Sequence, residues 1–337
     1  MEKRMTTKWI TLNDAPQVKG LGFRSFGGDS DYPKMITILS DIAKADREDD
    51  VYTLEDLRHD YSHLTHSDPA MDMLYAEIDG KTLAYARVDW YQEEDPNHRI
   101  YSVIINIHPE ARDQGIEAPM IKWCETRLRE KAADHPQDGA QFFQAYSNEK
   151  RGSHITVLET LGYKPVRYGI GMSRSLKNIP EGDLPEGIEV RPVKLEDCRK
   201  IWDASIEAFR DHWGFSEPEE EDYTSYSTSK YFQPELWQVA WYGDEVVGSV
   251  MNYVDLDYNQ KLNRNRGWTE EISTHREWRR KGIAKALIVR SMHMHKANGM
   301  TEVGLGVDTQ NPNGALQLYQ SLGYEKEREF ITFRKPM

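Results

Sequence analysis

The residues best suited to binding a charged ligand form a basic turn, Arg279-Arg280-Lys281-Gly282. Residues 268–274 alternate in the manner of a strand before this turn, and a helical apolar pattern begins at Ala284. Glycine allows the backbone to turn sharply at this point. The first N–H groups of a helix lack carbonyl partners and carry a partial positive charge, so a basic turn at a helix start suits an anion. The chemistry that this stretch predicts is phosphate binding.

Length and charge limit the classes of protein to which this chain can belong. A chain of 337 residues exceeds the size at which one core keeps growing, so we expect two domains. The net charge of −13 argues against a general nucleic-acid binder, which needs a positive field. It suits a cationic small-molecule substrate, although an ordinary acidic surface explains the charge more simply.

Cysteine usage and hydropathy indicate a soluble protein of a reducing compartment. Cys124 and Cys198 stand far apart without spaced partners, so neither a disulfide framework nor a zinc site is predicted. The first ten residues contain no apolar run typical of a signal peptide, and no stretch is long and apolar enough to span a membrane. We expect a cytoplasmic protein with no metal, no membrane and no nucleic-acid partner.

The positions of apolar residues and turns predict a strand- and helix-containing first half. A Pro- and Gly-containing segment, residues 178–187, follows it and is typical of a linker. We therefore expect an N-terminal domain at 1–177, a linker at 178–187 and a C-terminal domain at 188–337. In the first half the predicted strands are 21–26, 71–77, 82–91, 101–107, 141–146 and 163–174, with helices between them.

The same order of predicted elements begins again after the linker, which indicates an internal duplication. Gly115 and Gly282 lie 167 residues apart (282 − 115). Gly162 and Gly323, each within Leu-Gly-Tyr, lie 161 apart (323 − 162). Two similar offsets favour duplication over coincidence.

Two segments of the second half carry a resemblance to a known family. The turn Arg279–Ala284 resembles the acyl-CoA signature of the GNAT superfamily of N-acetyltransferases, and Asn311–Tyr324 is similar to the second signature of that family. The resemblance implies an α/β fold with two tandem GNAT domains, each a mixed, mostly antiparallel sheet flanked by helices. Mycothiol synthase is a member of the family with that architecture.

The resemblance implies that acetyl-CoA is the acyl donor, and it gives the residues around the turn their roles. The backbone N–H groups of 280–284 would cradle the pyrophosphate, and the three basic side chains would add charge. The strand edge at 272–274 would pair with pantetheine. The implied cofactor-binding residues are Ile272, Ser273, Thr274, Arg279, Arg280, Lys281, Gly282, Ile283, Ala284 and Asn311. The stretch around Asn311 also fits a plain turn and helix cap.

An amine acceptor is protonated at neutral pH, so the reaction needs a base. Glu270 and Glu271 are adjacent on the predicted strand and should face opposite sides, so that one alone can reach the reacting centre. The family places its bases on the face of the position nine before the first signature residue, which favours Glu270. Tyr319 falls where many members place the general acid that reprotonates CoA.

The first half departs from the family pattern. Glu117 occupies the place of a small residue, Asp113 adds a second negative charge, and Leu158 stands where the second half has Tyr319. A carboxylate near a diphosphate opposes binding. We expect the first domain to be catalytically silent and to bind acyl-CoA weakly or not at all.

Aromatic residues before the second hairpin, Phe209, Trp213 and Tyr226, are the candidate acceptor-binding residues, and an acidic run at 217–222 follows Trp213. The run would favour a cationic amine, although it also fits an exposed acidic loop. The function expected is acetyl transfer from acetyl-CoA to a primary amine of a small molecule, by a monomer or homodimer. The alternative is a non-catalytic acyl-CoA-binding or interaction protein.

Overall fold

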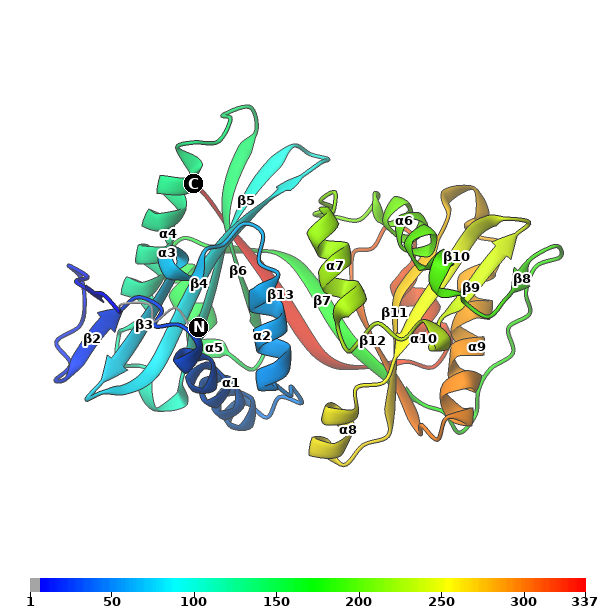
Figure 1. Cartoon of the computed structure of the whole chain (residues 1–337), viewed down its shortest axis with the longest axis horizontal. Coiled ribbons are helices and arrows are strands. Elements are labelled where there is room, and N and C mark those ends of the chain that lie inside the picture. Colours follow the sequence, from blue (N-terminus) through cyan, green and yellow to red (C-terminus); the bar gives the residue numbers. More distant parts are fainter. Residues whose placement is uncertain (1–6) are drawn as a thin grey trace. The chain divides into compact units, whose positions relative to one another are not determined.

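A computed structural model describes residues 7–337, so residues 1–6 of the expected first domain lie outside it. The chain forms two compact units, the first comprising residues through Arg167 with Phe330–Met337, and the second Tyr168–Glu329. Each unit is a mostly antiparallel sheet with helices packed on it (Figure 1). The expected α/β fold class is confirmed. Across the described residues, no helix is long and apolar enough to cross a membrane.

The first unit contains the strand order β1-β2-β3-β4-β5-β6-β13, in which β5 and β6 are parallel and the other neighbours are antiparallel. Its strands are β1 Trp9–Ile10, β2 Leu21–Arg24, β3 Met73–Ile78, β4 Lys81–Glu93, β5 His98–Ile107, β6 Ala140–Asn148 and the end of β13 Glu325–Pro336. Its helices are α1 Tyr32–Asp46, α2 Leu54–Ser62, α3 Pro69–Asp72, α4 Glu117–Ala132 and α5 Gly152–Thr160.

The second unit repeats this plan with the order β7-β12-β11-β10-β9-β8, in which β11 and β12 are parallel. Its strands are β7 Lys164–Ser175, β8 Glu189–Val190, β9 Gln238–Tyr242, β10 Glu245–Tyr253, β11 Arg266–Thr274 and β12 Glu302–Asp308. Its helices are α6 Cys198–Phe209, α7 Glu220–Thr228, α8 Leu256–Leu262, α9 Ile283–Ala297 and α10 Ala315–Ser321.

The two halves of the sequence exchange their last strands. Residues 169–175 of β7 follow the first half in sequence but pair with β12 in the second unit. Residues 330–336 of β13 end the second half but pair with β6 in the first unit. The chain therefore passes from the first unit to the second between Arg167 and Tyr168, whereas the sequence placed the linker at 178–187. β7 and β13 have similar apolar alternation and offer the same backbone groups. The sequence pattern alone could not show which neighbouring strand each of them pairs with.

The basic turn and its upstream counterpart have the same backbone conformation. Arg280 and Asp113 have φ of 62° and 61°, and Gly282 and Gly115 have φ of 89° and 72°. Positive φ is uncommon for a residue with a side chain. Its recurrence at both positions 167 residues apart supports the duplication inferred from the sequence.

The core of the second unit fixes the strands and helix that flank the basic turn. Leu287, Ile288 and Met292 on α9 are fully buried against Val303 and Leu305 of β12 and apolar residues of β10. These α9 positions match the helical pattern read from the sequence. The burial of this face sets where the start of α9 lies relative to the ends of β11 and β12.

A buried ion-pair cluster joins three strands at the start of β11. Arg266, whose side chain is 2% exposed, donates to Glu302 of β12 at 2.8 Å. Its other nitrogens donate to both carboxylate oxygens of Glu327 of β13, at 2.6 and 2.8 Å. Arg264 reaches the same two carboxylates from a more exposed position, at 3.4 and 3.7 Å. Arg266 thus holds β11, β12 and β13 together through bonds that water screens little.

Replacing Arg266 with leucine should lower the free energy of unfolding by about 3 kcal/mol, because two acidic side chains would lose their buried partner. Arg264→Leu is the matched control and should cost about 1 kcal/mol or less, as exposed ion pairs do. Urea denaturation followed by circular dichroism measures both. Equal losses in the two variants would contradict the role given to Arg266.

Candidate functional site

The parallel strands β11 and β12 separate shortly after they begin. Their pairing covers Arg266↔Glu302, Gly267↔Val303 and Trp268↔Gly304, while the strands continue to Thr274 and Asp308. A Cβ on Gly304 would lie 2.9 Å from the Trp268 ring, so this close approach requires glycine. Past Trp268, the edge of β11 that faces β12 has no strand neighbour. Its backbone groups are therefore available to a ligand.

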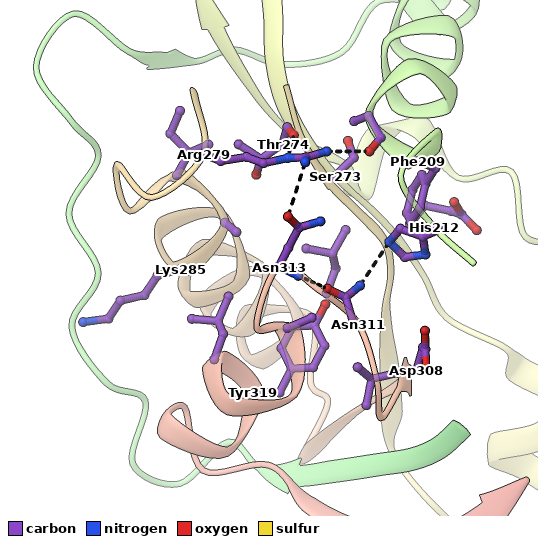
Figure 2. Close-up of a pocket in the computed structure, with 18 of the residues that line it drawn as sticks. Phe209, His212, Ser273, Thr274, Arg279, Lys285, Asp308, Asn311, Asn313 and Tyr319 are labelled. Carbon is purple, nitrogen blue, oxygen red and sulfur yellow. Dashed lines mark hydrogen bonds between the residues drawn. The ribbon is translucent and has the colours of Figure 1, made fainter. Parts of the chain in front are cut away.

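A cavity of about 620 Å³ lies where the strands have separated. This volume is within the range of small-molecule sites. Figure 2 shows side chains from the end of α6, from β11, from the start of α9 and from the loop before α10 around one opening. The cavity lies wholly within the second unit. Of the expected cofactor-binding residues, all except Lys281 line it.

The start of α9 forms one end of the cavity. Gly282 precedes the helix, and the N–H of Ala286 makes the first bond back to the carbonyl of Gly282. The N–H groups of residues 283–285 therefore have no carbonyl partner within the helix. Arg280, Lys281 and Lys285 are exposed around this end, and the Lys281 ammonium lies 4.4 Å from the centre of the Trp278 ring. This end of the cavity is electropositive and offers N–H donors to an anion.

Arg279 does not extend toward solvent as the other basic residues of the turn do. Its guanidinium donates to Asp211 at 2.6 Å and to the carbonyl of Ala208 at 2.9 Å. It also donates to Asn313 at 3.3 Å (Figure 2). Its Nε donates to the carbonyl of Thr274 at 3.3 Å. The charge expected to face a phosphate is thus engaged by protein groups.

Glu270 and Glu271 do not follow the regular alternation that was expected to turn them to opposite sides of the strand. The register of β10 and β11 shifts between Ser249↔Ser273 and Met251↔Glu270, and Glu271 has a φ of 46°. A β-bulge at Glu271 therefore interrupts the alternation of β11. Both carboxylate residues line the cavity. The sequence carries no glycine at this position to signal the bulge.

The Glu270 carboxylate lies between the separated strands. Its Oε1 accepts a hydrogen bond from the N–H of Gly306 on β12 at 3.0 Å. Burial raises the pKa of Glu270 to about 8, the nearby charge of Glu271 adds to the rise, and the Gly306 bond opposes it. Burial also raises the pKa of Glu271, but Glu271 is exposed to solvent in the cavity, which weakens that effect. Glu270 is the carboxylate whose pKa suits proton transfer near neutral pH.

Tyr319 combines a buried ring with a place in the cavity wall. The residue is 6% exposed and packs in the core beside Tyr324, with ring centres 6.0 Å apart. Burial raises its pKa, and the charge of Glu270 contributes. Tyr324, by contrast, bonds Thr269 in the interior at 2.9 Å. Tyr319 therefore belongs to the core and also lines the cavity.

The remaining candidates divide between the cavity and its surroundings. Phe209 lines the cavity, whereas Trp213 and Tyr226 are not among its lining residues. Tyr226 stacks on Trp202 and contacts Met251 through its hydroxyl at 3.5 Å, and the charge of Glu271 helps to raise its pKa. Asn311 lines the cavity, where its side chain contacts His212 and accepts from the N–H of Asn313 at 2.8 Å.

Several lining residues were not predicted. They come from the end of α6, from β12 and from α10, and include Ala208, His212, Gly306, Val307, Asp308 and Leu318. The signal in the sequence for β12 was its glycines. Gly304 and Gly306 are two apart on a strand and so lie on one face, which indicates that another group approaches this face closely. Within residues 7–337, no group of three or more His, Cys, Asp or Glu is arranged to hold a metal ion.

The corresponding region of the first unit is built differently. Parallel pairing of β5 and β6 continues to Val103↔Ala145, two positions beyond the counterpart of Trp268. Val103 and Ile104 occupy the positions of Glu270 and Glu271. At the start of α4, Glu117 pairs with His154 of α5. The strands of this unit stay paired for longer, and a glutamate meets a histidine where the second unit has Ala284 and Ala315.

Comparisons with known proteins agree with this geometry. Residues 199–324 match the Acetyltransferase (GNAT) family. A mycothiol acetyltransferase of Geodermatophilus obscurus is 23% identical over 278 residues, which cover 81% of this chain and 85% of that relative.

Solved structures extend the likeness over both units. A GCN5-related N-acetyltransferase from Sphaerobacter thermophilus matches with a TM-score of 0.74 at 25% identity, over 97% of each chain. A tandem GNAT protein from the clavulanic acid biosynthesis pathway shares the fold, with a TM-score of 0.66 at 11% identity over 98% of each chain. Residues 199–324 of the second unit therefore form a domain of the Acetyltransferase (GNAT) family, and the whole chain shares the fold of these solved GNAT proteins.

Proposed function

We propose that this protein transfers the acetyl group of acetyl-CoA to the primary amine of a small molecule, at one active site in the second unit. The observation that most supports this proposal is the cavity between β11 and β12. It combines an electropositive helix start, an unpaired strand edge and a carboxylate of raised pKa. These three features match the diphosphate, the pantetheine arm and the reacting amine, respectively.

Acetyl-CoA supplies the acetyl group as an activated thioester. We assign its diphosphate to the turn at 280–284, where N–H groups at the helix start and the exposed Arg280 and Lys281 favour negative charge. We assign pantetheine to the edge at Ile272–Thr274, because this edge has no strand neighbour toward β12. A backbone N–H of the same edge would polarise the thioester carbonyl.

Glu270 is the proposed general base. It removes a proton from the acceptor ammonium, directly or through water, and the amine nitrogen then attacks the thioester carbonyl carbon. The new C–N bond forms and the C–S bond breaks. In its ionised form, a carboxylate with a pKa of about 8 is a stronger base than an ordinary glutamate.

Tyr319 is the proposed general acid. Its raised pKa keeps the hydroxyl protonated at neutral pH, so a proton is available for the departing CoA thiolate. Tyr319 lines the same cavity as Glu270, on the opposite side of the strand opening from β11. Acid and base therefore come from different elements that the core holds together.

The acceptor is proposed to enter between the end of α6 and the separated strands. Phe209 and His212 form one wall there, and Glu271 and Asp308 add negative charge beside Glu270. An acidic region with an aromatic wall favours a cationic amine. Tyr226 of α7 stacks on Trp202 and Trp237, close enough to Glu271 for that charge to add to the effect of burial in raising the pKa of Tyr226.

Glu270→Gln should lower kcat by about 10²-fold or more, since general-base assistance is lost. In the wild type, kcat/KM should rise with pH until Glu270 is deprotonated at about pH 8, because a protonated carboxyl cannot accept a proton. This rise in kcat/KM around pH 8 should vanish in the variant. The pH dependence that remains should be the one caused by deprotonation of the amine substrate. CoA release from acetyl-CoA, measured over pH with a panel of amines, tests this. An unchanged pH profile would remove Glu270 as the base.

Glu271→Gln is the matched control for Glu270. The negative charge of Glu271 raises the pKa of Glu270. Removing this charge should move the rise of kcat/KM to lower pH, while kcat on the plateau persists. A loss of turnover equal to that of Glu270→Gln would contradict this division of roles.

Tyr319→Phe should lower kcat by about 10²-fold with little change in the KM for acetyl-CoA, because the hydroxyl acts on the leaving thiolate. Tyr324→Phe is the control, since its hydroxyl bonds Thr269 in the interior. Steady-state kinetics of both variants measure the effect. Equal rates in Tyr319→Phe and the wild type would remove Tyr319 as the acid.

Isothermal titration with CoA should find one site per chain. Ala284→Glu should abolish this binding, because it places at the start of α9 the charge that Glu117 carries in the first unit. Glu117→Ala should leave the single site unchanged. Two tight sites in the wild type would contradict the assignment of the cofactor to the second unit alone.

A further inference from the structure

The guanidinium of Arg279 connects three walls of the cavity. It binds Asp211 and the carbonyl of Ala208 at the end of α6, and the carbonyl of Thr274 at the end of β11. It also binds Asn313 in the loop before α10. A guanidinium has five N–H donors in a fixed fork, and here its three nitrogens all face protein acceptors.

A second contact joins two of the same walls. His212 lies one residue after Asp211 and contacts the Asn311 side chain at 3.2 Å, and Asn311 in turn accepts from the N–H of Asn313 (Figure 2). Asp211 is held from the other side by Arg276 at 2.8 Å. The end of α6 is therefore attached both to the signature turn and to the loop before α10.

The arginine–aspartate pair also occurs in the first unit. Arg112 lies 167 residues before Arg279 and binds Asp46, the last residue of α1, through two bonds of 2.6 Å. The turn in that unit carries Asp113 and Glu117 in place of Arg280 and Ala284. The pair thus persists where the charges suited to a diphosphate are absent. If the pair shapes the turn, its presence in both units is explained. If the arginine neutralised phosphate, only the pair in the second unit would be explained.

We infer that Arg279 and Asp211 are positioning residues, which place the signature turn and the α6 wall around the cofactor without contacting its phosphates. This inference rests on the proposed function. Arg280 and Lys281, together with the N–H groups at the start of α9, then provide the favourable charge. Because Phe209 ends α6 and His212 follows in the next turn, the same pair sets the acceptor wall and links the two substrate sites.

Arg279→Lys separates charge from geometry, because lysine keeps the positive charge but cannot form the fork. CoA affinity from isothermal titration should fall about tenfold or more, since an ammonium cannot bind the separate acceptors that the guanidinium joins. The dependence of affinity on salt should keep the wild-type slope. Arg280→Lys should leave affinity near the wild-type value, and Arg280→Ala should flatten the salt dependence. Retained CoA affinity in Arg279→Lys would overturn the inference.

Asp211→Asn and Asp46→Asn make the same change in the two units. Asp211→Asn should raise the KM for acetyl-CoA and the Kd for CoA several-fold, with a smaller effect on kcat. Asp46→Asn should lower the thermal midpoint but leave CoA affinity unchanged, because its pair lies in the first unit. Wild-type affinity in Asp211→Asn, or equal weakening in both variants, would overturn the inference. Failure of the wild type to bind CoA would instead overturn the proposed function.

Discussion

The early end of pairing between two parallel strands is the constraint on which the site depends. Where the two strands are still paired, Arg266 binds the carboxylates of Glu302 and Glu327. At the last pair, Gly304 leaves room for the Trp268 ring against the backbone of β12. Beyond this point each strand is held by its outer neighbour and by the core under α9. The backbone edge between them is left without a strand partner. Backbone groups of a strand normally pair with a neighbouring strand, so this edge is a place where a ligand can complete the hydrogen bonding.

The bulge at Glu271 gives this opening its chemical character. Regular alternation would have sent one of two adjacent glutamates away from the cavity, whereas the extra residue brings both into its wall. Burial raises the cost of ionising Glu270, the nearby charge of Glu271 adds to it, and the pKa of Glu270 is thereby raised to about 8, where a base is useful. A residue with a side chain at a φ of 46° is disfavoured, and such conformations gather at functional sites. The backbone irregularity and the shifted pKa are thus parts of one arrangement.

The sequence predicted most of the elements and the location of the site, because those depend on local patterns. The strand at 268–274, Gly282 and the helix after it follow from alternation, a breaker and an apolar face, and the structure contains all three. The relation between Glu270 and Glu271 could not be predicted, since it depends on a bulge that no glycine marks. The partners of Arg279 were hidden for another reason: Asp211 and Asn313 lie 68 and 34 residues away in sequence. Contacts of that kind follow from tertiary packing and leave no periodic signal.

The strand exchange bears on how such a chain can change over time. The β7 strand, encoded with the first half, lies beside β12, whose residues Gly306 and Val307 line the cavity. A gene shortened to its second half would lose that strand, and one shortened to its first half would lose the strand that β13 adds to β6. Each half of the gene thus encodes a strand that the other unit needs, so selection that preserves the cavity also preserves both halves.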